Sequence, residues 1–329
     1  MPATTATSRS TPPSLLEPVG AEGLQRLNFA ALGTKCAVQF VAADLAQRTA
    51  FAQNAECWVR AFEAKFTRFR SDSLVGRINA AAGRAWVEVD AEMELMLDLC
   101  ESLFAMTQGV LDPTALPLLR LWDYKAEHPR LPSAAELAAA RRLVGWRRVQ
   151  RRAGAVFLPE EGMALDFGGF GKEYAVDMIA QLAADYGIAD VLVDFGHDVR
   201  VLGKPPGRPC WHLGLEDPLQ PGVAKGSLGV TGKGVASSGD YLRSFVFEGR
   251  RYGHIIDPRT GMPVDHGVRQ VTVVADTCLQ AGVLSTTAFV LGQQEGLPYI
   301  QAFPGAEGLM RTAEAEAQTR GFFNYVVNA

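Results

Sequence analysis

The chain has 329 residues, of which 48% are hydrophobic and 21% charged, and its formal net charge is −4. This is enough apolar sequence to bury the core of one large domain or two small ones, while the slightly acidic charge excludes a global basic field for nucleic acid or anionic membrane. Five scattered cysteines with no C-x-x-C pair argue against a disulfide framework or zinc site and favour a reducing compartment.

The N-terminal stretch differs in composition from the rest of the chain. The first twenty residues are rich in Thr, Ser and Pro, with one Arg, no apolar run and no cysteine for a lipid anchor. We therefore predict a disordered tail over residues 1–25 rather than a secretion signal. Residues 26–329 are expected to form a single domain, with two intertwined subdomains as the alternative. Since no later run is long enough to span a membrane, we expect a cytoplasmic protein without membrane insertion.

The first half of the chain is predicted to be mainly helical. Residues 27–42 form a β-rich stretch with a turn at 31–34, and a helix follows in which Trp58, Phe62 and Phe66 share one face. A second helix is expected from about 90 to 107. Ser133 and Glu136 have the spacing of a capping box, and Gly145 is expected to end that helix.

The second half is predicted to be mostly β. A strand at 164–167 should enter a glycine-rich turn and then a helix at about 172–186. A hairpin is expected to close around Glu248-Gly249, and a late helix at 277–291 to end at Gly292. The remaining strands are expected at 191–195, 211–215, 227–230, 235–237 and 271–274. Because helices cluster early and strands late, without βαβ alternation, the fold class is α+β.

The turn D-F-G-G-F-G-K-E spans Asp166 to Glu173. Its glycines let backbone N–H groups approach a phosphate, the helix N-terminus supplies partial positive charge, and Lys172 supplies a full one. The spacing fits neither a Walker A loop nor a dinucleotide fingerprint. A tight packing turn is the alternative interpretation.

A second block combines residues 237–241 with the sequence H-x-x-D-P-R-T-G-x-P at 254–263. A histidine at a strand end, beside Asp, Arg and Thr in a turn bounded by Pro and Gly, is poorly explained as core. Before any family is considered, a functional and a structural role for His254 are equally supported.

Together these blocks resemble the FAD:protein FMN transferase (ApbE-type) family from about Ala31 to Gly292. The motifs follow one another in the family's order. Besides the two blocks above, they are Leu32-Gly33-Thr34, Phe66-Thr67-Arg68-Phe69 with Ser73 and Asn79, Gly109-Val110-Leu111-Asp112-Pro113-Thr114, and Val193-Asp194-Phe195-Gly196.

The resemblance implies an ApbE-like α+β fold, with helices on mixed or antiparallel sheets around a central cleft for FAD. It implies catalytic roles for His254 and Asp257 at the reacting end. The FAD-binding residues that it implies are Gly33, Thr34, Asp112, Thr114, Gly169, Lys172, Ser238, Gly239, Asp240, Tyr241, Arg259 and Thr260.

The same resemblance implies a reaction. Family members place Mg²⁺ against the pyrophosphate, attack the FMN phosphorus with an acceptor Thr or Ser hydroxyl, and release AMP. Such a phosphoryl transfer depends mainly on positioning and charge neutralisation. The expected partners are FAD and a separate acceptor protein with a small-residue Thr/Ser motif, because this chain has no obvious copy of that motif.

The chain departs from the family at the metal site. The family's Ala-Asp-x-x-x-Thr stretch reads Ala281-Gly282-Val283-Leu284-Ser285-Thr286 here, so the implied metal ligands are the Gly171 carbonyl and Thr286, while Gly282 replaces the usual Asp. Glycine inside a helix costs about 1 kcal/mol relative to alanine. The glycine is therefore expected to admit a close backbone, a water or part of the ligand. Gly282→Asp is expected to restore the pair with Thr286 if both residues face the cleft.

Two further departures add carboxylates. Glu173 follows Lys172 where the family has glycine, and His197-Asp198 replaces Gly-Asn or Gly-Asp. Glu173, Asp198 or Asp276 could supply a substitute metal ligand, or all three could be surface charges and strand-end caps.

Loss of the family's aspartate leaves two alternatives to the transferase. One is a flavin-binding protein with little or no catalytic activity, and the other is an FAD pyrophosphatase that transfers the FMN phosphorus to water. Retention of Lys172, His254, Asp257 and Thr286 together favours an active transferase with a weakened or rebuilt metal site.

Overall fold

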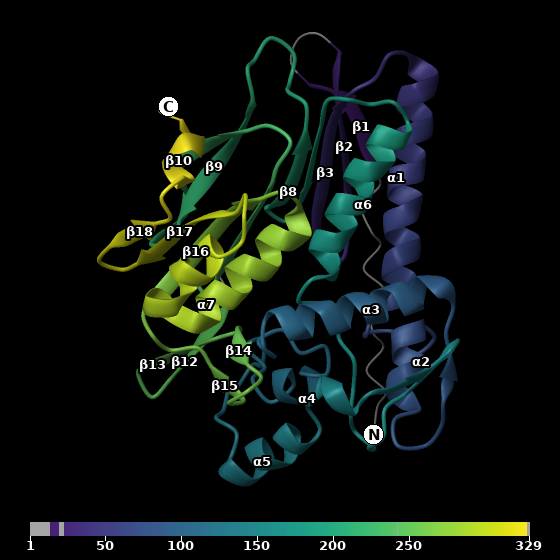
Figure 1. Ribbon diagram of the computed structural model, residues 1–329, viewed down its shortest axis with the longest axis vertical. Coiled ribbons are helices and arrows are strands. Elements are labelled where there is room, and N and C mark those ends of the chain that lie inside the picture. The colour runs from purple at the N-terminus through teal and green to yellow at the C-terminus, as the bar shows by residue number, and fades with distance from the viewer. Residues whose placement is uncertain (1–13, 20–22, 242, 328–329) are drawn as a thin grey trace.

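A nine-stranded antiparallel sheet runs through the molecule (Figure 1). The computed structural model describes residues 14–19, 23–241 and 243–327. In sheet order the strands are β1 (Leu15–Pro18), β2 (Leu24–Ala31), β3 (Thr34–Val41), β7 (Val191–Phe195), β8 (Asp198–Leu202), β11 (Gly234–Gly239), β16 (Val268–Ala275), β17 (Glu307–Thr312) and β18 (Glu316–Gln318).

Smaller sheets and seven α-helices complete the described part of the chain. One three-stranded sheet consists of β19 (Val326–Val327), β10 (Gln220–Val230) and β9 (Trp211–Asp217). The other consists of β4 (Val87–Glu88), β6 (Ala155–Phe157) and β5 (Gln150–Arg152). The hairpins are β12 (Ser244–Phe247) with β13 (Arg250–Gly253), and β14 (Ile256–Asp257) with β15 (Met262–Pro263). The helices are α1 (Leu45–Phe66), α2 (Leu74–Ala80), α3 (Ala91–Met106), α4 (Leu116–Leu119), α5 (Ala134–Arg142), α6 (Gly171–Asp185) and α7 (Cys278–Gln301), with 3₁₀ turns at Trp146–Arg148 and Phe322–Tyr325.

The two faces of the large sheet carry different layers, and β7 shows how its sequence produces them. Successive side chains of a strand point to opposite faces. Val191 and Val193 are buried in the core formed with α1 and α6, whereas Leu192 is buried on the other face, in the core formed with β9 and β10. Helix α7 packs on β11 and β16. The α+β prediction is therefore confirmed, and the sheets are antiparallel.

Several local predictions are confirmed. The turn at Leu32-Gly33 joins β2 to β3, and Ser133 and Glu136 form the predicted capping box of α5. Glu248 and Gly249 close the β12–β13 hairpin with φ of 48° and 78°, as a tight two-residue turn requires. Gly292, with φ of 78°, interrupts α7 where the helix was expected to end, although a second segment continues to Gln301.

Two predicted boundaries and one predicted strand need correction. Leu15–Pro18 pair with β2, so a strand begins inside the predicted tail at 1–25, of which residues 1–13 and 20–22 lie outside the described residues. Helix α5 ends at Arg142, before Gly145. Residues 164–167 are not a strand; the buried Leu165 instead pairs both of its backbone groups with the Asn79 side chain, at 2.7 Å and 2.9 Å.

The Asn79 contact leads to a stability prediction. In Asn79→Ala the buried N–H and C=O of Leu165 lose their partners, and each such loss costs about 1–3 kcal/mol. We expect the free energy of unfolding to fall by about 2–4 kcal/mol, measured by urea denaturation. Asn79→Asp keeps the acceptor for the Leu165 N–H but sets a carboxylate oxygen against the Leu165 carbonyl, so this variant should lose stability as well. A loss below about 0.5 kcal/mol in Asn79→Ala would show that water replaces the side chain.

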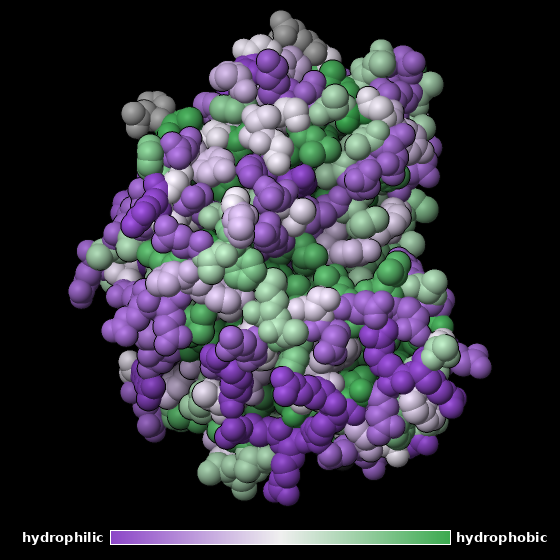
Figure 2. Space-filling model, in the orientation of Figure 1, coloured by the Kyte–Doolittle hydropathy of each residue, from purple (hydrophilic) through white to green (hydrophobic). Residues whose placement is uncertain are grey.

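The face shown in Figure 2 mixes hydrophilic and apolar residues, and apolar residues are visible at mid-height between α6 and α7 above and α3 below. No helix of the described residues is both long and apolar enough to cross a membrane. The five cysteines, all within the described ranges, are free thiols, and Cys36, Cys100 and Cys278 are buried.

Candidate functional site

The turn between β2 and β3 lies directly against the turn between β7 and β8. Gly33 has a φ of 70°, and Gly196 has a φ of 64° and donates its N–H to the Lys35 carbonyl at 3.0 Å. A Cβ at Gly196 would overlap the Thr34 side chain. The predicted residues Gly33 and Thr34 are thus placed beside the β7–β8 turn that leads into Asp198.

Asp198 forms an ion pair with Lys172 in the first turn of α6. The Asp198 side chain is 6% exposed and that of Lys172 is 26% exposed. No side chain caps α6, and Gly168 and Gly169 before it are exposed. The helix therefore presents backbone N–H groups and partial positive charge, which suit a phosphate, while the Lys172 ammonium already has a buried partner.

The loop that contains Asp112 is locked by its own side chains. Asp112 Oδ1 accepts hydrogen bonds from the backbone and hydroxyl of Thr114 at 2.8 Å and 2.5 Å, and Thr114 Oγ1 accepts from Gly145 N at 2.7 Å. Thr114 is fully buried. Its side chain therefore holds the loop and has no exposed surface for a ligand. The Pro113 carbonyl accepts from Asp166 N at 2.8 Å, which joins this loop to the glycine-rich turn.

A pocket of about 280 Å³ lies beside this loop. Of the predicted site residues, Asp112 and Arg259 line it. Its other lining residues come from the end of α3, from α5 and from the 257–261 turn: Phe104, Gln108, Gly109, Arg141, Val144 and Pro258. Sequence reasoning assigned no role to Phe104 or Arg141, although Arg141 donates to the Arg259 carbonyl at 3.1 Å.

The His254 imidazole is neutral, and one of its ring nitrogens can accept a proton. Its Nδ1 lies 3.2 Å from the Arg243 carbonyl. Because a carbonyl only accepts, the proton resides on Nδ1 and Nε2 is the acceptor. Burial, and then the Arg243 charge, lower the pKa of His254 to about 4. The ring also packs 5.8 Å from that of Tyr124. A neutral imidazole with an accepting Nε2 can take a proton from a hydroxyl at pH 7.

Asp257 is engaged by its neighbour Arg259. The carboxylate accepts from Arg259 Nε and from a terminal guanidinium nitrogen, each at 2.9 Å. The Asp257 carbonyl accepts from Thr260 N at 3.1 Å and from Gly261 N at 2.7 Å. Asp257, Arg259 and Thr260 therefore belong to one compact turn, in which the bidentate pair orients the arginine.

Ser238 joins β11 to α7 through hydroxyl groups. Its Oγ lies 2.8 Å from both Ser285 Oγ and Thr286 Oγ1. Ser285 is fully buried and was not predicted as a site residue; its position next to Thr286 was the available signal. The contact places the implied metal ligand Thr286 beside the implied FAD ligand Ser238.

Asp240 and Tyr241 are both tied to neighbouring charges. Asp240 is 7% exposed, and its Oδ2 lies 3.0 Å from the Arg251 guanidinium. The Tyr241 hydroxyl donates to Glu216 Oε2 at 2.6 Å, and burial, followed by this contact, raises the pKa of Tyr241. At Gly239 a Cβ would lie 2.7 Å from the Arg269 carbonyl, so the close approach of β11 to Arg269 requires glycine.

The three candidate substitute carboxylates have different surroundings. Asp276 is 63% exposed and pairs with Lys233 at 2.6 Å, which confirms the surface-charge interpretation for this residue. Asp198 is committed to Lys172. Glu173 is 13% exposed, and its buried Oε2 has no hydrogen-bond partner within the described residues. The same part of the chain contains no group of three or more His, Cys, Asp or Glu side chains that could hold a metal ion.

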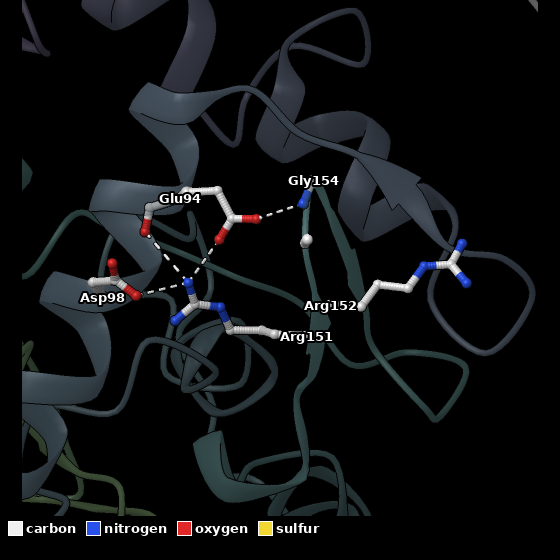
Figure 3. A pocket seen from close by; sticks show the side chains of 6 residues that line it. Glu94, Asp98, Arg151, Arg152 and Gly154 are labelled. Carbon is white, nitrogen blue, oxygen red and sulfur yellow. Dashed lines mark hydrogen bonds and ion pairs between the residues drawn. The ribbon is translucent and has the colours of Figure 1, made fainter.

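A second hollow lies elsewhere and is crossed by ion pairs between the residues that line it. This open depression of about 540 Å³ is lined by Glu94, Asp98 and residues 151–154. Arg151 contacts both Glu94 and Asp98 at 2.7 Å, while Arg152 points away from them (Figure 3). No predicted site residue lines it, and we assign it no function.

Comparison with known proteins agrees with this architecture. A sequence model described as the ApbE family matches residues 32–310. The FAD:protein FMN transferase of Treponema pallidum is 32% identical over 257 residues, which cover 73% of this chain and 71% of that protein. The crystal structure of the ApbE protein from Thermotoga maritima is 30% identical, covers 93% of this chain and 100% of its own, and has a TM-score of 0.83. The flavinyl transferase ApbE of Pseudomonas stutzeri is 27% identical, with coverages of 93% and 98% and a TM-score of 0.80. The protein described here therefore belongs to the ApbE family.

Proposed function

We propose that this protein is an FAD:protein FMN transferase. The observation that carries the proposal is that the separate sequence motifs meet through direct contacts. Thr34 packs on the turn that leads to Asp198, Asp198 pairs with Lys172, and Ser238 bonds to Thr286. Relatives that match over most of this chain have the name FAD:protein FMN transferase.

The proposed reaction assigns distinct tasks to these groups. The uncapped N-terminus of α6 binds the FAD diphosphate through backbone N–H groups. The acceptor hydroxyl oxygen bonds to the FMN phosphorus, the bond from that phosphorus to the bridging oxygen breaks, and AMP leaves with the bonding electrons. His254 Nε2 receives the hydroxyl proton. In this assignment Arg259, oriented by Asp257, contributes positive charge near the pocket.

The residues also fit a divalent cation. Thr286 would contribute a hydroxyl, and Gly171 would contribute the carbonyl that the family resemblance implies. The buried Glu173 Oε2, which has no hydrogen-bond partner within the described residues, would provide an anionic ligand. When bound, Mg²⁺ would neutralise charge on the diphosphate. A cytoplasmic location and a Thr/Ser acceptor motif stay as predictions that belong with this function.

The two alternative functions are not favoured. A pure flavin carrier has no use for a neutral histidine with a free Nε2, and the curated relatives are named as transferases. The direct test is incubation with FAD, Mg²⁺ and a peptide that carries a small-residue Thr/Ser motif, followed by mass spectrometry. Covalent FMN on the peptide with release of AMP supports the transferase. FMN and AMP without modified peptide would indicate the pyrophosphatase, and unchanged FAD the carrier.

The proposed function also predicts a binding preference. FAD should bind more tightly than FMN, because the implied contacts extend from Gly33 to Thr286 and are too many for a mononucleotide. Calorimetry with each flavin measures this preference. The control is AMP, which tests whether the adenosine half binds on its own. Equal or tighter binding of FMN would contradict an FAD site.

A further inference from the structure

The Glu173 side chain on α6 fills the space beside Gly282 on α7, which has no side chain of its own. Gly282 on α7 is packed against Glu173 on α6, and a Cβ at position 282 would lie 2.6 Å from Glu173 Cγ, 3.2 Å from Cδ and 3.3 Å from Oε1. Real Cβ atoms essentially never approach another heavy atom as closely as 2.6 Å, so a side chain at position 282 would require the Glu173 side chain to shift. The Glu173 carboxyl group therefore occupies the volume of a side chain at position 282.

The contact between the two helices fixes this placement. One turn further along α6, Asp177 accepts hydrogen bonds from the backbone of Cys278 at 2.9 Å and of Leu279 at 2.8 Å. Residues four apart lie on the same face of a helix. Glu173 and Asp177 thus share one face of α6, which meets Gly282 and Cys278 on one face of α7. The Asp177 hydrogen bonds therefore hold the two helix backbones together at the level of Glu173 and Gly282.

Within the described residues the Glu173 carboxylate makes no hydrogen bond through its buried Oε2, and its ion pair with Lys172 is distant. The Glu173 Oε1 is 3.9 Å from Lys172 Nζ, too far for a hydrogen bond. The Lys172 ammonium is instead bound to Asp198. Because a buried carboxylate without a partner is costly, a ligand that supplies positive charge would be stabilising here.

We propose that Glu173 supplies the metal-binding carboxylate of this protein in place of residue 282, and that Gly282 is glycine in order to admit it. The inference rests on the proposed function, which brings a divalent cation to this place. The two departures from the family pattern are then one reciprocal exchange. Glycine stands where the family has Asp, and Glu stands where the family has glycine. Glu173 would hold the cation with its carboxylate and Thr286 with its hydroxyl.

The proposal changes the expected behaviour of Gly282→Asp. The sequence alone predicts that this variant restores the family's pair with Thr286 and gains metal affinity. In the structure the new side chain overlaps Glu173, so the single variant should lose thermal stability and gain no affinity. The double variant Glu173→Gly/Gly282→Asp removes the overlap, returns the carboxylate to α7, and should bind metal like the wild type.

The test is Mn²⁺ binding followed by the electron paramagnetic resonance signal of the free ion, with saturating FAD. Glu173→Gln keeps the shape of the side chain but removes its charge, and we expect the Mn²⁺ dissociation constant to rise about 10–100-fold with little change in melting temperature. Asp276→Asn, which removes an exposed carboxylate, should bind Mn²⁺ like the wild type.

Three outcomes would overturn the inference. These are unchanged Mn²⁺ affinity in Glu173→Gln, no Mn²⁺ binding by the wild type with FAD, and tighter Mn²⁺ binding in the single Gly282→Asp variant. The transfer assay separates this result from the proposed function. If the wild type transfers FMN but Glu173→Gln keeps its Mn²⁺ affinity, only the inference fails. If Glu173→Gln loses affinity while the wild type modifies no peptide, only the transferase assignment fails.

Discussion

Replacement of His254 by alanine is expected to lower the rate of FMN transfer by roughly 10²–10⁴-fold, the usual contribution of a positioned general base. The expectation rests on the Nδ1 contact with the Arg243 carbonyl, which leaves Nε2 as the proton acceptor. FAD affinity should change little, because this role concerns the acceptor hydroxyl. The measurement combines single-turnover transfer, followed by mass spectrometry, with calorimetric FAD binding.

A matched variant and a pH profile identify the histidine as the base. In His254→Asn the side-chain amide can still donate to the Arg243 carbonyl but no base is present, so the loss should equal that of alanine. Since the pKa of His254 is lowered to about 4, the imidazole is neutral at pH 7 and becomes protonated only as the pH falls toward 4. The wild-type rate should therefore persist below pH 6.5 and decline near pH 4–5. Full activity of both variants would mean that Asp257 or the metal, and not His254, activates the acceptor hydroxyl.

Removal of the Lys172 side chain should destabilise the protein strongly. Lys172→Ala leaves the Asp198 carboxylate, which is 6% exposed, without its cation. Breaking a buried pair costs about 3–5 kcal/mol, and because the ammonium is partly exposed we expect about 2–4 kcal/mol from the free energy of unfolding in urea. The sequence predicts that Lys172→Ala weakens FAD binding more than stability. The ion pair adds a structural role to that predicted FAD-binding role.

The double variant Lys172→Ala/Asp198→Asn separates those tasks. It removes the unpaired charge, so most of the lost stability should return. FAD affinity should stay low in both variants if the Lys172 ammonium also contacts the diphosphate. If Lys172→Ala unfolds at the wild-type urea concentration, water must reach Asp198, and the pair contributes little to stability.

Local signals predicted most elements correctly, for reasons visible at particular residues. The Ser133–Glu136 capping box and the Glu248-Gly249 turn act over a few residues, so their sequence spacing suffices. The predicted strand at 164–167 is wrong because Leu165 bonds to Asn79, a residue 86 positions away. No local sequence pattern indicates an extended segment whose backbone hydrogen bonds go to one distant side chain.

The candidate site was less predictable than the fold. Motif order brought Thr34, Lys172, Ser238 and Thr286 into consideration, but their hydrogen-bond partners depend on how α6, α7 and the sheet pack. Sequence alone left Glu173, Asp198 and Asp276 equivalent. They separate only when burial and the Gly282 contact are known. Likewise, nothing in the 112–114 motif shows that the Thr114 hydroxyl holds Gly145.

The pairing of β3 with β7 has a consequence for synthesis on the ribosome. Phe40 pairs with Val191, so the β2–β3 hairpin emerges long before the strand that covers its inner edge. Roughly 150 residues must be translated in between, which takes about 8–30 s at ~5–20 residues per second. Throughout that time the N-terminal hairpin offers an unpaired strand edge and the buried side of Val38 and Phe40 to other chains. We therefore expect the nascent hairpin to be prone to aggregation until residue 195 has left the exit tunnel.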